Sequence, residues 1–134
     1  MPGWRNMPEY GQLICTSEAL ADGGAGVRFG LVHRGREIGA FAVRHGGTVY
    51  AYLNECAHVP MEMDWQEGQF FDATQTWLMC ATHGALYEPH TGRCVGGPCR
   101  GAKLVALTVQ EELGKVCWIP GGDFQPLPTS LTSS

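Results

Sequence analysis

Two short segments that combine cysteine with histidine constrain this chain more than any other feature of its sequence. The first reads CAH from Cys56 to His58, and the second reads CATH from Cys80 to His83, with residues 59–79 between them. Each segment offers one soft thiolate and one imidazole, and both groups are common metal ligands in proteins. The four side chains therefore predict one metal site made of two mixed halves.

Two kinds of metal site use two cysteines and two histidines. A structural zinc ion is one, but zinc fingers usually pair cysteine with cysteine and histidine with histidine, whereas each half here is mixed. The other is a [2Fe–2S] cluster with two cysteines on one iron and two histidines on the other. The spacing favours the cluster, and zinc stays open as the alternative.

The rest of the sequence predicts an all-β domain with many turns. The 134 residues suit one domain with its own core, 19 of them are glycine, and only 16% are charged. Apolar residues alternate with polar ones in short runs bounded by glycine, as in half-buried strands. We expect strands at residues 27–33, 37–44, 48–53, 77–80, 85–87, 103–109 and 116–119. The first two dozen residues are expected to be irregular, and the tail from 120 to 134 to be mobile.

The sequence around the four ligands resembles the Rieske family. The resemblance rests on the C-x-H and C-x-x-H spacing and on the stretch CATHGALYEPHTGRCVGGP from Cys80 to Pro98, and it extends over roughly residues 27–119. It implies a single antiparallel domain, sandwich-like or barrel-like, over residues 1–134. A small cluster-binding subdomain would be inserted at about 55–100.

The resemblance also implies the cofactor and the residues that contact it. One Rieske-type [2Fe–2S] cluster per chain would be held through Cys56, His58, Cys80 and His83. Gly96, Gly97 and Pro98 occupy the place of a loop that shields the cluster, although an ordinary surface turn is the alternative.

Three positions bear on the subtype and on the reduction potential. Tyr87 stands where high-potential relatives have a hydrogen-bond donor to the cluster, although it could equally be a half-buried strand aromatic, and Ala85 replaces a second donor. Met61 and Thr82 stand where quinol-oxidising relatives have a bracing disulfide. These positions point to an oxygenase-type ferredoxin of low to intermediate potential.

The remaining cysteines do not suggest a disulfide scaffold. Cys15 and Cys117 lie in apolar or mixed segments and read as small buried hydrophobes. Cys94 and Cys99 could lie close together, but we expect no stable disulfide between them in a reducing compartment. The cytoplasm is the expected location, because the sequence has no secretory or twin-arginine signal.

Composition and missing motifs exclude several functions. A net charge of −4 argues against nucleic-acid binding, and no apolar run approaches the ~20 residues that cross a membrane. No histidine follows His90 to build a mononuclear iron site, and no G-x-G-x-x-G motif binds NAD or flavin. The protein is therefore expected to be no enzyme itself.

The expected function is electron transfer with protein partners. The chain would carry one electron between a flavin reductase and a terminal oxygenase or another oxidoreductase. The alternative is a non-catalytic small Rieske subunit of a larger oxidoreductase, such as nitrite reductase. The acidic residues around the first ligand segment would form a solvated face, or else a docking patch for a basic partner. They are Glu55, Glu62, Asp64 and Glu67.

Overall fold

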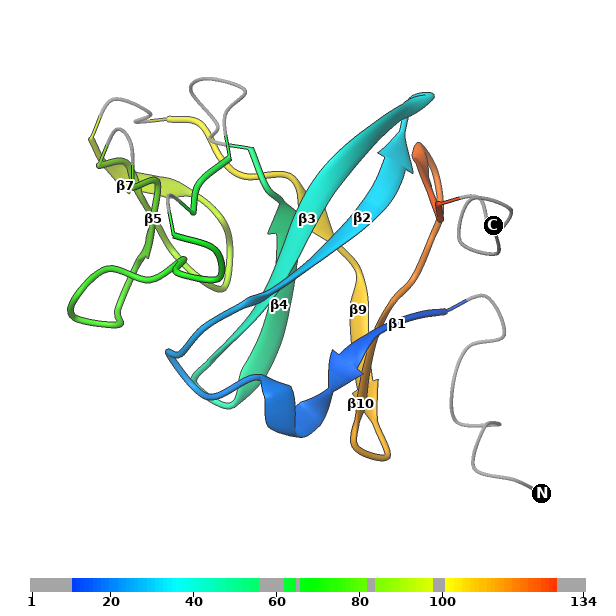
Figure 1. Cartoon of the computed structure of the whole chain (residues 1–134). Coiled ribbons are helices and arrows are strands. Elements are labelled where there is room, and N and C mark those ends of the chain that lie inside the picture. The colour runs from blue at the N-terminus through cyan, green and yellow to red at the C-terminus, as the bar shows by residue number, and fades with distance from the viewer. Residues whose placement is uncertain (1–10, 56–61, 65, 82–83, 98–100, 128–134) are drawn as a thin grey trace.

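The computed structural model describes residues 11–55, 62–64, 66–81, 84–97 and 101–127. Within these residues the chain folds into antiparallel strands and one short 3-10 helix (Figure 1). The elements are β1 (Gln12–Thr16), η2 (Ser17–Ala19), β2 (Val27–His33), β3 (Arg36–His45), β4 (Thr48–Leu53), β5 (Leu78–Met79), β6 (Leu86–Tyr87), β7 (Cys94–Gly96), β8 (Ala106–Leu107), β9 (Val109–Glu112), β10 (Lys115–Trp118) and β11 (Phe124–Gln125). The prediction of an all-β antiparallel fold is confirmed.

The described strands form three sheets. The large sheet has the order β11-β2-β3-β4-β8, the edge sheet β1-β10-β9, and the small sheet β5-β6-β7. The small sheet comes between β4 and β8 in sequence, and Figure 1 shows it to one side of the long β2–β3–β4 meander. In the sequence, the residues predicted to bind the cluster fall between β4 and β8, as this small sheet does.

Strand β3 is buried on both faces because each face of the large sheet covers a different core. Ala40 and Ala42 point into the core shared with the edge sheet, while Phe41 and Val43 point into the core shared with the small sheet. All four side chains are fully buried. Side chains alternate between the two faces of a strand, so one apolar run can serve two cores.

The tight turn between β3 and β4 is fixed by a residue that is distant in sequence. The carboxylate of Asp22 accepts hydrogen bonds from the backbone N–H groups of Gly46 and Gly47, at 3.0 and 2.6 Å. Arg44 reaches from β3 to the carboxylate of Glu111 on β9, at 2.6 Å. These polar contacts connect the large sheet to the edge sheet and to the segment after η2.

Several strand predictions need correction. The first two dozen residues are not all irregular, because β1 pairs with β10 in the edge sheet. The predicted strand at 103–109 is divided between β8, which pairs with β4, and β9, which pairs with β10. The tail is not free from residue 120 onward, because β11 pairs with β2. Residues 128–134 lie outside the described part of the chain.

No helix in the described part of the chain has the length and the apolar character needed to cross a membrane.

Candidate metal centre

Of the four predicted metal ligands, Cys80 lies in the described structure. Cys56, His58 and His83 lie outside the described residues, as does Pro98 of the predicted covering loop. Cys80 directly follows β5 and is fully buried. The first ligand segment starts just after β4, so both segments begin at the end of a strand.

The second ligand segment comes between β5 and β6 in the sequence, and backbone hydrogen bonds join the described residues on either side of it. The backbone N–H of Cys80 donates to the carbonyl of Ala85 at 2.9 Å, and the N–H of Gly84 donates to the carbonyl of Cys80 at 2.7 Å. These two bonds fix both ends of the CATHG stretch. The Cys80 side chain is thereby directed into the core beneath the small sheet, together with Met63 and Ala85.

The predicted covering loop approaches the second ligand segment directly. Gly96 pairs with Leu86 across the small sheet, and Gly97 follows with a φ of +86°. A Cβ on Gly97 would lie 3.0 Å from the Cα of Ala85 and 3.1 Å from the carbonyl oxygen of Gly84. Only glycine allows this approach without a shift of backbone. The structure therefore brings Gly96 and Gly97 beside the turn that carries Cys80.

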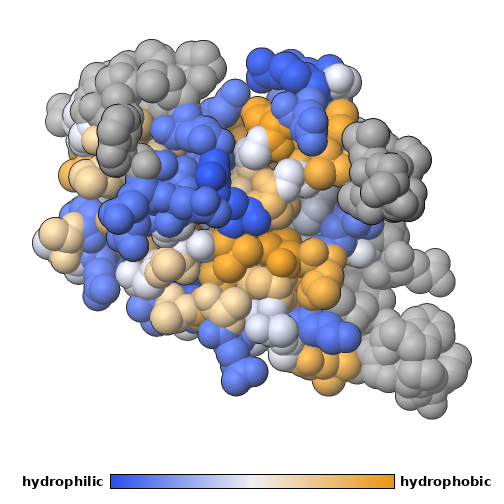
Figure 2. All heavy atoms as spheres, viewed as in Figure 1, coloured by the Kyte–Doolittle hydropathy of each residue, from blue (hydrophilic) through white to orange (hydrophobic). Residues whose placement is uncertain are grey.

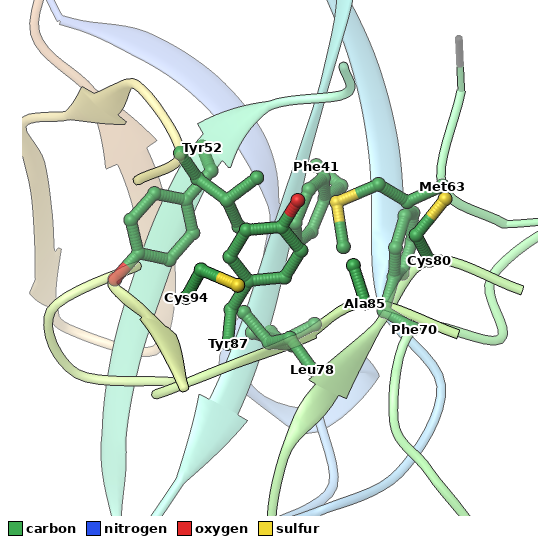
Figure 3. Close-up of a cluster of buried hydrophobic side chains, with 11 residues drawn as sticks. Phe41, Tyr52, Met63, Phe70, Leu78, Cys80, Ala85, Tyr87 and Cys94 are labelled. Atoms are coloured by element: carbon green, nitrogen blue, oxygen red, sulfur yellow. The ribbon is translucent and has the colours of Figure 1, made fainter. Parts of the chain in front are cut away.

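Tyr87 is fully buried rather than half-buried. It pairs with Leu78 on one side and with Cys94 on the other, so its ring enters the core at the centre of the small sheet. Figure 3 shows its hydroxyl on the side of the core where Met63 and Cys80 lie. Tyr87 is thus a fully buried strand aromatic, and its contact with the cluster stays a prediction.

A second buried tyrosine, Tyr52 on β4, has its hydroxyl committed elsewhere. Its hydroxyl donates to the carbonyl of Pro89 at 2.7 Å, and burial raises the pKa of this phenol above its usual range. The neighbouring rings of Phe41 and Phe70 stack with their centroids 3.9 Å apart. These side chains pack together in the core beneath the small sheet.

The acidic residues around the first ligand segment form the expected solvated face only in part, because the side chains of Glu62 and Glu67 are exposed while that of Asp64 is buried. Arg28 on β2 lies at their centre: it hydrogen bonds to Glu62, and its Nε is 3.5 Å from Asp64 Oδ2. The Asp64 side chain is fully buried, and Glu55 pairs with Arg36 at 3.4 Å. In the view of Figure 2, hydrophilic residues gather on the left of the described surface and apolar residues in its centre and on its right. Neighbouring arginines thus partly neutralise the acidic set.

The expectation that the later cysteines form no disulfide is wrong for Cys94. This residue is disulfide-bonded, and its partner is not among the described residues. Cys94 lies on β7 immediately before the turn at Gly97, and its Sγ is 3.3 Å from the carbonyl oxygen of Gly96. Cys117 is buried as expected, whereas Cys15 is only half-buried. Burial raises the pKa of both thiols.

The donor chemistry of the described site suits a soft metal centre. Within the described ranges no three histidine, cysteine or acidic side chains converge, since three of the four predicted ligands fall outside them. The described residues contribute the buried thiol of Cys80, the apolar core around it, and the loop at Gly96 and Gly97 that approaches Ala85. Thiolate ligands in such a setting are typical of iron–sulfur clusters.

The described residues form an antiparallel all-β domain with an inserted small sheet that buries a cysteine. The model of the Rieske [2Fe-2S] domain matches residues 12–118, which is most of the chain. The chain belongs to this family, and its cofactor is a Rieske-type [2Fe–2S] cluster.

Solved structures show the same fold at low sequence identity. The ferredoxin of carbazole 1,9a-dioxygenase from Nocardioides aromaticivorans IC177 is similar, with a TM-score of 0.66 and 23% identity over 84% of this chain and 100% of that one. A ferredoxin of Sphingomonas yanoikuyae B1 gives a TM-score of 0.60 and 22% identity over 83% and 99%. The terminal oxygenase of the Nocardioides system gives 0.65 and 21% over 90% of this chain but only 32% of the oxygenase. No curated protein sequence matches the chain.

Proposed function

We propose that this protein carries single electrons between a reductase and a terminal oxygenase or a related oxidoreductase. The observation that carries the proposal is the end-to-end likeness to ferredoxins of oxygenase systems, which extends over 100% and 99% of two such chains. The terminal oxygenase shares the fold over only 32% of its length. This chain therefore resembles the carrier more completely than the enzyme that the carrier serves.

The proposal assigns the four sequence-predicted ligands to the cluster. Cys56 and Cys80 would hold one iron, and His58 and His83 would hold the other. When bound, the cluster accepts and releases one electron, and neutral histidines make its reduction easier than in an all-cysteine centre. The buried position of Cys80 supports its assignment to the iron held by the two cysteines, which would lie farther from the surface.

Two further parts of the chain would tune and protect the cluster. The Gly96–Gly97–Pro98 segment would exclude water from it, which is supported by the close approach of Gly97 to Ala85. The hydroxyl of Tyr87 would donate a hydrogen bond to the cluster and so favour its electron-rich reduced form. The full burial of Tyr87 in the same core cluster as Cys80 supports this role.

The proposed partners follow from the same likeness. One similar structure is a complex of reduced oxygenase and oxidized ferredoxin in carbazole 1,9a-dioxygenase. By analogy, a flavin reductase would supply the electron to this chain and a terminal oxygenase would receive it. The chain itself would perform no catalysis and would need neither a membrane nor nucleic acid.

A cytoplasmic location completes the proposal. The disulfide at Cys94 is the feature that argues against it, because stable disulfides are rare in a reducing cytosol. Cell fractionation with an antibody to this chain would decide the location directly.

The test uses the purified holoprotein and its redox partners. We expect an electron paramagnetic resonance signal on one-electron reduction and a voltammetric wave in the lower part of the range of roughly −150 to +300 mV. The reduced protein should then reoxidise rapidly when a Rieske-type terminal oxygenase and its substrate are added. A stoichiometric large partner that stays bound during size exclusion from cell extract would overturn the shuttle in favour of the subunit alternative.

A further inference from the structure

Two buried polar side chains, one before and one after the first ligand segment in the sequence, face each other in the core. Asn54 and Asp64 are 2% and 7% exposed, in a core that is otherwise apolar. The side-chain amide of Asn54 donates to Asp64 Oδ1 at 2.9 Å, and its oxygen accepts from the backbone N–H of Met63, also at 2.9 Å. One asparagine thus connects both sides of the stretch that contains Cys56 and His58.

The same network is anchored to the large sheet. The backbone N–H of Asn54 donates to the carbonyl of Gly39 on β3 at 2.9 Å. The second carboxylate oxygen of Asp64 accepts from the N–H of Gly68 at 3.0 Å and lies 3.5 Å from Arg28 Nε on β2. No buried side-chain nitrogen or oxygen in the described residues is left without a partner. A fully satisfied buried network of this kind holds its members in one geometry.

Met63 connects this network to the second ligand segment. Its N–H is bound by Asn54, and its carbonyl accepts a 2.9 Å hydrogen bond from the N–H of Ala81, the residue after Cys80. Met63 is fully buried in the same core as Cys80. A continuous chain of hydrogen bonds therefore runs from the large sheet through Asn54 and Met63 to the residue beside the ligand Cys80.

We propose that Asn54 and Asp64 are positioning residues that fix the two ligand segments relative to each other and so set how tightly the cluster is held. The sequence has Met61 and Thr82, and so no cysteine pair, with which to join these segments covalently. The hydrogen-bonded network connects the two segments instead. The inference rests on the bound cluster and is independent of which redox partners the protein uses.

Exchanging the two side chains tests the network. In Asp64→Asn, the amide has one acceptor oxygen where two donors, from Asn54 and Gly68, must be satisfied. In Asn54→Asp, two carboxylates face each other in a buried site. The double variant Asn54→Asp/Asp64→Asn restores the hydrogen bonds of this pair but not the ion pair with Arg28. The carboxylate at position 54 accepts from Met63 and from the new amide, whose oxygen accepts from Gly68. Net charge is conserved.

The measurements are made on the isolated holoprotein. We expect each single variant to lose the visible absorption of the cluster about tenfold faster than the parent in the presence of an iron chelator, and the double variant to recover most of that loss. The g values of the reduced cluster should shift in the single variants and return in the double variant. A residue that only stabilised the fold would leave those g values unchanged.

A matched control comes from the same region of the chain. The Asp72 carboxylate also accepts backbone hydrogen bonds, from Thr76 and Trp77, but it is only half-buried and takes no part in this network. Asp72→Asn should leave bleaching rate and g values as in the parent.

The proposal is overturned if the single variants behave like Asp72→Asn, or if the double variant bleaches as fast as they do. If neither single variant folds, the double variant decides alone by the same two readouts. Failure to deliver electrons to an oxygenase would affect none of these results.

Discussion

A Cβ on Gly97 would lie 3.0 Å from the Cα of Ala85, so the covering segment and the second ligand segment are in backbone contact. Neither residue can move away from this contact without disturbing the packing around it. Ala85 is fully buried, and the strand before Gly97 is paired to β6. A substitution at position 97 therefore tests directly how the proposed covering segment lies over the cluster.

Gly97→Ala should destabilise the holoprotein by about 1–2 kcal/mol and shorten the life of the cluster, because the new methyl group meets backbone atoms and the φ of +86° is strained for alanine. Thermal unfolding and bleaching of the visible absorption measure the two effects. Gly114→Ala is the control, since Gly114 has a φ of +76° with no atom near its Cβ position. It should reproduce the strain but leave the bleaching rate alone. Equal bleaching in both variants would contradict the proposed cover.

Tyr87→Phe should lower the reduction potential by about 60 mV, which for one electron corresponds to about 1.4 kcal/mol, the scale of one hydrogen bond to a charged group. The reason is that the proposed donor favours the reduced cluster. Voltammetry of the purified variants measures the change. Tyr52→Phe removes an equivalent hydroxyl from the same core, but that hydroxyl is bound to Pro89, so the potential should not change. Identical potentials in Tyr87→Phe and the parent would remove Tyr87 from the proposal.

His83→Cys tests the ligand assignment itself. A third thiolate makes the cluster more negative, so the potential should fall toward that of all-cysteine [2Fe–2S] centres, near −400 mV, and the absorption and paramagnetic spectra should change. His90→Cys is the control, because His90 is exposed at a turn before β7. It should keep the parent spectra. Unchanged spectra in His83→Cys would show that this histidine holds no iron.

The local alternation of the sequence was sufficient to predict β2, β3 and β4, because each is long and borders a glycine turn. It was insufficient for β1, whose register shifts between Leu13 and Cys15 and so breaks the alternation. Strands β7 and β11 are too short to show a period, and partners distant in sequence define them.

The candidate site was predicted to a similar extent. The Cys/His spacing indicated the metal centre, and a glycine-rich stretch indicated the cover. The burial of Asn54 and Asp64 was not predicted, since asparagine and aspartate are usually exposed, and Asp64 was assigned to a surface acidic set. Their burial depends on contacts between segments that no local pattern reports. The disulfide at Cys94 was missed because compartment, rather than local geometry, was used to judge it.

The last prediction concerns pH and the contact between β3 and β9. The Arg44 guanidinium, hydrogen-bonded to Glu111 at 2.6 and 3.0 Å, holds the pKa of that carboxyl below its usual value of 4.5. A carboxyl whose pKa is lower in the folded state stabilises the fold above its unfolded pKa, and this stabilisation is lost as the pH falls through the folded pKa.

Glu111→Gln should therefore be less stable than the parent by about 1 kcal/mol at neutral pH, with a difference that shrinks as the pH falls from about 5 to about 3. Denaturant unfolding at several pH values measures it. Glu112→Gln is the control, because Glu112 lies next in the same strand and its side chain is bonded to Gln110 rather than to an arginine. That variant should follow the parent at every pH. A Glu111→Gln difference that stayed constant down to pH 3 would mean that packing, rather than the ion pair with Arg44, connects the two sheets here.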